Sequence, residues 1–135
     1  MVSRLLQFNI HSDPESLGDA RRRVRDALMQ AGLAIDAAQD MEVAVGEALS
    51  NIYRHAYSTG VGPVAVEVLT SGGAFTVVVH DEGEATVPPA IPRSLPPRTS
   101  PGGRGLYLIR NFADDVEFRV NPSGHGVTVR MTKEA

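Results

Sequence analysis

Cysteine is absent from this chain of 135 residues, and its absence removes several kinds of site at once. Without cysteine there can be no disulfide framework, no thiolate metal site and no cysteine nucleophile. A net positive charge is also missing, since the formal net charge is -3, so no overall basic field is available to hold a nucleic-acid backbone. No apolar run approaches the roughly 20 residues of a membrane span, and the N-terminus lacks a basic-then-apolar export pattern. We therefore expect a soluble cytoplasmic protein with no direct nucleic-acid or membrane partner.

The length of the chain falls within the roughly 100 to 150 residues that are commonest for one domain. We therefore expect a single core over residues 1–135. Positive charge is concentrated locally at residues 19–26 (DARRRVRD), where four arginines lie between two aspartates. A solvated helix face explains this run about as well as a docking surface does.

Hydrophobic periodicity predicts both strands and helices. Alternating apolar residues predict strands at residues 4–10, 64–68, 75–79, 116–120 and 127–131. Helical spacing predicts helices at residues 14–30, 36–57 and 105–111. Ser12 or Asp13 before Pro14 is a helix-start signal, and Asp36 with Gln39 resembles a capping box that opens the second helix.

The order of these elements indicates the fold class. Runs of helices beside antiparallel hairpins are typical of an α+β two-layer sandwich, here with a mixed, mostly antiparallel sheet and helices on one face. A doubly wound parallel fold would need regular alternation of strands and helices, which is missing. Residues 81–104 are rich in Pro, Gly, Ser, Thr and Arg and predict a long loop, and such loops in compact domains are usually functional or disordered.

The second predicted helix carries a polar stripe. Glu47, Asn51 and His55 follow one another at four-residue intervals, and Arg54 lies close to the same stripe. With a rise of about 1.5 Å per residue, Glu47 and Asn51 stand roughly 6 Å apart along the helix axis. The carboxylate could accept a proton and the amide oxygen could bind Mg²⁺, which prefers oxygen ligands. A solvated stripe on an amphipathic helix would give the same pattern.

Two further segments have the chemistry of a nucleotide site. Asp81-Glu82-Gly83 delivers a carboxylate at a strand end, where it could accept a hydrogen bond from an adenine amino group while Gly83 leaves room for the ring; a plain turn is the alternative. Residues 102–105 (GGRG) lead directly into a helix, where glycines and free N–H groups can receive phosphate. This segment is neither a Walker loop nor a dinucleotide fingerprint, and a flexible hinge would also explain it. The four histidines have no metal-ligand spacing among themselves.

Three segments in order resemble the N, G1 and G2 boxes of Bergerat-fold ATPases: residues 47–57 (EALSNIYRHAY), 81–83 (DEG) and 102–109 (GGRGLYLI). Within that histidine-kinase-like superfamily the chain looks most like the anti-sigma-factor serine kinases. Residues 113–116 (ADDV) and 124–129 (GHGVTV) are similar to the stretches that follow the G2 box in that group. The resemblance covers most of the chain. It departs at Ala85, where the family commonly has a second glycine, so we expect the ATP lid at about residues 84–104 to close differently.

The resemblance implies roles for individual residues. Glu47 would be the general base that activates the acceptor serine, Asn51 would ligate Mg²⁺, and Asp81 would read adenine beside Gly83. Gly103 and Gly105 would cradle the phosphates of ATP, with Arg104 as a charge partner. The remaining nucleotide-binding candidates are Arg54, His55 and Leu106.

The same resemblance implies an ATP-binding anti-sigma factor that is also a serine-protein kinase. Its partners would be a sigma factor and a STAS-type anti-anti-sigma protein, which it phosphorylates in a partner-switching pathway. Arg21 is then a candidate partner contact, and a homodimer is compatible with the family. One alternative is an ATP-binding regulatory module that sequesters its partner without phosphorylating it. A second is the catalytic domain of a histidine kinase, although no phospho-accepting histidine segment precedes residue 4.

Overall fold

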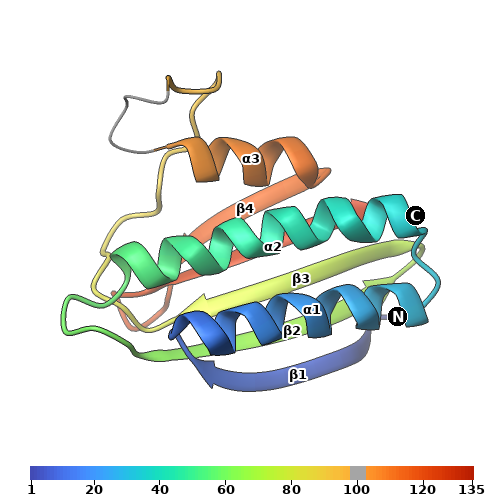
Figure 1. Cartoon of the computed structure of the whole chain (residues 1–135), viewed down its shortest axis with the longest axis horizontal. Coiled ribbons are helices and arrows are strands. Elements are labelled where there is room, and N and C mark those ends of the chain that lie inside the picture. The colour runs from blue at the N-terminus through green and yellow to red at the C-terminus, as the bar shows by residue number, and fades with distance from the viewer. Residues whose placement is uncertain (98–102) are drawn as a thin grey trace.

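The computed structural model describes residues 1–97 and 103–135 (Figure 1). In chain order its elements are β1 (Ser3–His11), α1 (Pro14–Gln30), α2 (Ile35–His55), β2 (Pro63–Ser71), β3 (Ala74–Asp81), α3 (Arg104–Phe112), β4 (Asp115–Val120) and β5 (Val127–Glu134). Each expected helix and strand is present, and most of the strands extend further than the alternation predicted. Asp81 consequently lies at the end of β3 rather than in the loop that follows.

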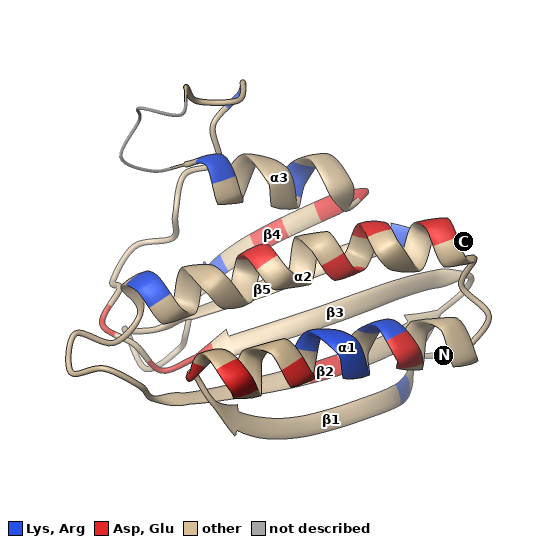
Figure 2. Ribbon diagram, in the orientation of Figure 1, with Lys and Arg blue, Asp and Glu red and all other residues tan. Residues whose placement is uncertain are grey.

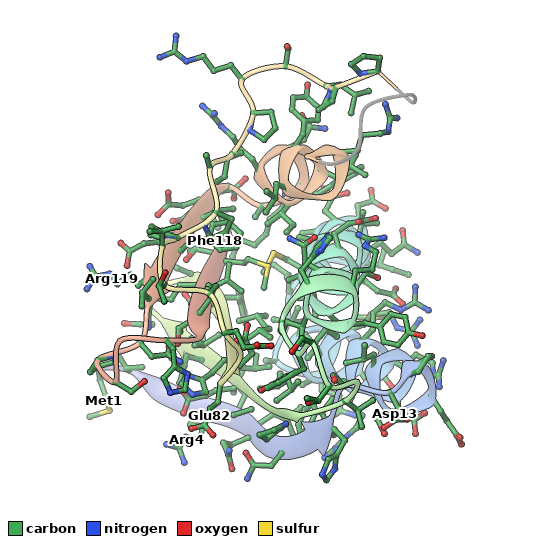
Figure 3. All side chains as sticks on the ribbon, turned by 90° about the vertical axis from the view of Figure 1, so that its left-hand side faces the viewer. Met1, Arg4, Asp13, Glu82, Phe118 and Arg119 are labelled. Carbon is green, nitrogen blue, oxygen red and sulfur yellow. The ribbon has the colours of Figure 1, made fainter. Side chains whose placement is uncertain are left out.

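The sheet has the strand order β1-β2-β3-β5-β4. Every pairing in the described part of the chain is antiparallel, which confirms the mostly antiparallel sheet and leaves no parallel pair there. The helices cover one face of this sheet, so the expected two-layer α+β architecture is also confirmed (Figure 3). Because β5 lies between β3 and β4, the turn that leads into β5 comes next to the end of β3.

The core lies between the sheet and the helices α1 and α2. Alternate residues of β2 and β3 face the helices and are fully buried, as period-two patterning requires. The largest side chains that pack against them from the helices are Val24, Leu28, Met41, Val45 and Leu49. Because these residues recur every three or four positions, they form one apolar stripe on each helix. The opposite stripe of α2 is left free for polar residues.

The helix ends agree with the sequence signals at α1 and differ at α2. The Asp13 carboxylate accepts a hydrogen bond from the Ser16 N–H at 3.0 Å and caps α1. The expected capping box at Asp36 is wrong, because α2 begins at Ile35 after Ala34 and has no side-chain cap. Asp36 lies inside the first turn instead, where its charge is still favourable near the positive end of the helix dipole. None of the described helices is long and apolar enough to cross a membrane.

The arginine run on α1 does not form an open basic patch. Figure 2 shows basic and acidic residues interspersed on α1 and α2. Arg22 contacts Asp19 at 2.5 Å, and Arg25 lies 3.5 Å from the Glu42 carboxylate on α2. A solvated and locally neutralised helix face therefore accounts for most of this charge.

Candidate functional site

A cavity of about 290 Å³ lies between the C-terminal half of α2 and the sheet, at the end of the molecule where β3 finishes and α3 begins. This end is on the left of Figure 1 and faces the viewer in Figure 3, where Phe118 lies on the sheet side. The wall is mostly apolar, and its polar members are Asn51, His55 and Asp81. Small-molecule sites are typically apolar cavities of roughly 300 to 1,000 Å³ with few polar groups, so this cavity lies at the lower end of that range.

Among the described residues that line this cavity Asp81 is the one carboxylate, and it is only 6% exposed. Its Oδ1 atom accepts hydrogen bonds from the N–H groups of Gly83 at 2.8 Å and of Val127 at 3.2 Å. Within residues 1–97 and 103–135 no donor reaches Oδ2. One carboxylate oxygen is thus held by the backbone while the other can accept a hydrogen bond from a ligand, for example from an exocyclic amino group.

The polar stripe of α2 meets the start of α3. A methyl group built on Gly105 would lie 2.8 Å from Glu47 Oε2, 3.6 Å from Arg54 Nη2 and 3.9 Å from Asn51 Oδ1. All three side chains therefore converge on one backbone position at the first turn of α3. The absence of a side chain at Gly105 leaves space beside the carboxylate and the amide. The fold thus brings the polar stripe of α2 and the glycine-rich start of α3 together as one polar cluster.

Glu47 also borders a second space, a groove of about 390 Å³ between α1 and α2. Arg21 lines the same groove, where its Nε atom lies 3.8 Å from Glu42 Oε2. A methyl group on Gly46 would come within 3.0 Å of Arg21 Cδ, so this glycine lets the arginine lie across α2. Arg21 therefore lies away from the apolar cavity but on the same side of α2 as Glu47.

Gly83 has a packing role beside the one expected. A methyl group there would lie 2.3 Å from the Ala56 carbonyl oxygen and 2.8 Å from its carbon. Gly83 is therefore required because the chain just after β3 runs directly against the C-terminal end of α2. Room for an adenine ring beside Gly83 stays a prediction.

The expected lid segment lies against Gly103, the residue before α3. Gly103 has a φ of +91°, and a methyl group on it would lie 3.0 Å from Pro92 Cγ and 3.4 Å from Pro96 Cγ. The Arg104 guanidinium donates a hydrogen bond to the Pro96 carbonyl, so in this structure its charge holds the lid backbone. Leu106 and the start of the lid line the apolar cavity. Gly102 and the rest of residues 98–102, which belong to the expected lid, lie outside the described residues.

Contacts that the sequence analysis did not anticipate hold the start of the lid. The Glu84 carboxylate accepts hydrogen bonds from Ser58 N at 2.7 Å and Ser58 Oγ at 3.0 Å, and these bonds lower the pKa of Glu84. The Tyr57 hydroxyl accepts from the Glu82 N–H at 2.8 Å, and partial burial raises the pKa of Tyr57. The Ala85 carbonyl accepts from the N–H of Gly126. At Ala85, where the resemblance implies a second glycine, the chain is therefore held through Glu82, Glu84 and Ala85 itself.

Asn121, between the predicted strands 116–120 and 127–131, is a further residue near the site that no sequence pattern indicated. Its side chain is 7% exposed, and its amide donates to the Asp81 carbonyl at 2.7 Å. A polar side chain at the start of a predicted turn is too common a pattern to indicate such a contact.

The residues present fit ATP with Mg²⁺. The apolar cavity with its free carboxylate oxygen suits a purine base, and the N-terminus of α3 offers free N–H groups to phosphate. In the described part of the chain no group of three or more acidic or histidine side chains is placed to hold a metal. An amide oxygen such as that of Asn51, together with phosphate oxygens and water, is the kind of ligand set that Mg²⁺ accepts in phosphate sites.

Comparison with known proteins gives a consistent family. The family described as histidine kinase-like ATPase domain matches residues 10–133. The serine-protein kinase RsbW of Bacillus velezensis is 31% identical over 95% of this chain and 84% of the relative. The anti-sigma F factor of Thermoanaerobacter pseudethanolicus is 28% identical over 97% of this chain and 94% of the relative.

Solved structures agree in fold. The crystal structure of the RsbU and RsbW domains of a Mycobacterium tuberculosis protein matches with a TM-score of 0.70 at 19% identity, over 96% of this chain and 31% of that one. A histidine kinase domain from a blue-light activated kinase of Erythrobacter litoralis matches with a TM-score of 0.52 at 21% identity, over 87% of this chain and 60% of that one. At these identities the likeness concerns the fold alone.

Proposed function

The chain belongs to the histidine kinase-like ATPase domain family, in the group of anti-sigma-factor serine kinases, and we propose that it binds ATP and phosphorylates a serine of a STAS-type anti-anti-sigma protein. The observation that carries this proposal is the convergence of Glu47 and Asn51 on the start of α3, at the same end of the molecule as Asp81. Three groups are then available around one nucleotide. They are the Asp81 carboxylate for the adenine ring, the N–H groups of α3 for the phosphates, and the Glu47 carboxylate as the proton acceptor. We place this activity in the cytoplasm, where sigma factors work.

The adenine ring would enter the apolar cavity and donate its amino N–H to Asp81 Oδ2. A hydrogen bond to a charged group contributes about 1.5 to 3 kcal/mol, so Asp81→Asn is expected to weaken ATP binding by about tenfold to a hundredfold. The triphosphate would then extend toward Gly103 and Gly105 at the N-terminus of α3. Leu106 and His55 would lie beside the adenine ring, since both line the cavity.

Asn51 would hold Mg²⁺, which neutralises phosphate charge when it is bound. Glu47 would accept the proton of the serine hydroxyl. The serine oxygen then forms a bond to the γ-phosphorus while the bond between the γ-phosphorus and the leaving ADP breaks. Arg54, beside the same cluster, would orient phosphate oxygens. Arg104 donates to the lid in this structure and would have to leave Pro96 to reach phosphate. Phosphoryl transfer asks mainly for positioning and charge stabilisation, which these groups supply.

The test of catalysis uses labelled ATP, Mg²⁺ and a STAS-domain protein from the same genome. Wild type is expected to transfer phosphate to the STAS protein, and Glu47→Ala is expected to bind ATP but transfer none. If wild type binds ATP and controls its partner with no transfer of phosphate, the chain is instead the non-catalytic regulatory module. Phosphate appearing on a histidine of the chain itself would point to the histidine-kinase alternative.

We propose that the partner proteins, a sigma factor and the STAS protein, contact the groove that Arg21 and Glu47 share. A serine presented from this side would reach Glu47 without crossing the base cavity. Arg21→Ala is expected to weaken sigma-factor binding measured by calorimetry, while Arg22→Ala is the matched control because Arg22 pairs with Asp19 outside the groove. Equal effects of the two substitutions would contradict this docking site. The mass of the complex in the same samples tests whether the chain works as a homodimer.

A further inference from the structure

We propose that Asn121, in the turn between β4 and β5, is a positioning residue that orients Asp81 and thereby sets the preference of the site for a 6-amino purine nucleoside triphosphate. This inference rests on the proposed binding of ATP at Asp81. It adds a residue that lies 40 positions from Asp81 in sequence and does not line the cavity.

Asn121 is held on both sides of its side-chain amide. Its Nδ2 atom donates to the Asp81 carbonyl at 2.7 Å, and its Oδ1 atom accepts from the Thr128 hydroxyl at 2.7 Å. A reversed amide would place its oxygen against the Asp81 carbonyl oxygen, so the Asp81 carbonyl determines the orientation of the amide and the Thr128 hydroxyl donates to the amide oxygen. Since the hydroxyl proton of Thr128 is engaged, His80 Nδ1, 2.8 Å from the same oxygen, carries a proton and donates it. The buried amide is therefore part of a satisfied network and has one arrangement.

The turn that carries Asn121 is pressed against the backbone of Asp81. Gly126 has a φ of +81°, and a methyl group on it would lie 2.6 Å from the Asp81 carbonyl oxygen and 2.7 Å from Asn121 Nδ2. Any side chain at Gly126 would force this turn away from β3. The next residue, Val127, donates its N–H to Asp81 Oδ1 at 3.2 Å. Asn121 thus holds the Asp81 main chain at the place where the turn also holds the carboxylate.

This double attachment determines which carboxylate oxygen a ligand meets. Oδ1 is engaged by two backbone N–H groups, so Oδ2 is the oxygen presented to a base in the cavity. Adenine offers an amino donor to it, whereas hypoxanthine offers a carbonyl oxygen at the same ring position, which the carboxylate repels. When the Asn121 amide is removed, the carbonyl and the turn lose a buried hydrogen bond and the carboxylate loses its fixed direction. The difference in binding free energy between ATP and inosine triphosphate should then shrink.

The test measures the dissociation constants of ATP and inosine triphosphate for wild type and for Asn121→Ala. Wild type is expected to prefer ATP by about tenfold or more, as one hydrogen bond to a charged group allows. Asn121→Ala is expected to reduce this preference by about threefold to tenfold, through weaker ATP binding with inosine triphosphate little changed. Asn9→Ala, an exposed asparagine on β1, is the control and should leave both constants unaltered.

A milder variant tests the same inference in case Asn121→Ala does not fold. Thr128→Val removes the hydroxyl that donates to the amide oxygen of Asn121 and should shift the ATP preference in the same direction by a smaller factor. Thr132→Val on the same strand removes a hydroxyl whose hydrogen-bond partner among the described residues is Thr76, so it is the matched control. If Asn121→Ala melts at a lower temperature but both variants keep the wild-type preference, Asn121 is merely structural and the inference is overturned. An equal loss for both nucleotides overturns it too. If wild type binds no ATP, the proposed function itself fails.

Discussion

A methyl group added at Gly105 should separate the folding of this protein from its catalysis. The backbone there is an ordinary helical conformation, since Gly105 is not among the glycines with positive φ. Alanine is favoured over glycine within helices by up to about 1 kcal/mol, so Gly105→Ala should leave the free energy of unfolding equal to or above that of wild type. The obstacle is the new methyl carbon, which would lie only 2.8 Å from Glu47 Oε2.

The size of the catalytic effect follows from this distance. Carbon and oxygen atoms seldom approach closer than about 3.3 Å, so the Glu47 carboxylate must withdraw by about 0.5 Å. The carboxylate ends a flexible side chain and can move at little cost in stability. A misplacement of about 1 Å can cost about a hundredfold in rate, so a displacement of half that size should slow phosphoryl transfer by roughly tenfold. ATP affinity is expected to fall as well, because the methyl group would also lie within 4 Å of Arg54 and Asn51 on the path of the triphosphate, so the rates are compared at saturating ATP.

Single-turnover transfer of labelled phosphate to the STAS protein at saturating ATP measures this effect, together with urea denaturation and ATP titration. Asn111→Ala is the matched control, because it also favours the α3 helix but lies on an exposed face of α3. Its transfer rate should equal that of wild type. If Gly105→Ala is as stable as wild type and transfers phosphate within twofold of the wild-type rate, Glu47 does not act as the base at this position, and the assigned geometry is refuted.

Three further predictions concern the frame around the site. Gly83→Ala would overlap the Ala56 carbonyl and should lower the free energy of unfolding by about 1 to 3 kcal/mol, measured by urea denaturation, whether or not nucleotide is present. Glu84→Gln should be less stable than wild type near neutral pH. The hydrogen bonds from Ser58 lower the folded-state pKa of Glu84, so their stabilisation is present above the unfolded pKa and is lost as the pH falls through the folded pKa. The stability difference between the two proteins should therefore shrink on acidification, and a constant difference would show that the carboxylate charge is irrelevant. Met41→Ala in the buried core should cost about 2 to 5 kcal/mol through loss of packing, and a smaller loss would mean that the core between α2 and the sheet collapses onto the space.

Local patterns were sufficient for the elements of the fold. Alternation in residues 64–68 and 75–79 reflects the pleat of a sheet buried on one face, so it predicts strands before any pairing is known. The Asp13 cap depends on atoms three residues apart, and the sequence therefore predicts it well. The Asp36 capping box shows the limit of such motifs, because α2 already begins at Ile35 and Asp36 lies inside its first turn.

The candidate site was predictable as a set of residues and not as an arrangement. The spacing of Glu47 and Asn51 follows from helix geometry, and the three boxes resemble one family in order. The groove shared by Glu47 and Arg21, and the contact of Gly105 with Glu47, depend on where α1 and α3 pack against α2. No periodicity within one helix contains that information.

The helices, the strands and the chemical groups that a nucleotide would meet follow from local sequence, since these depend on neighbours a few residues apart. The position of β5 between β3 and β4, and with it the approach of Asn121 and Gly126 to Asp81, emerges with the folded sheet. Strand order is a property of the whole sheet, because it depends on which backbone edges can pair while every apolar face stays buried. The direction of a single carboxylate in the cavity is therefore set by residues that no local pattern connects to it.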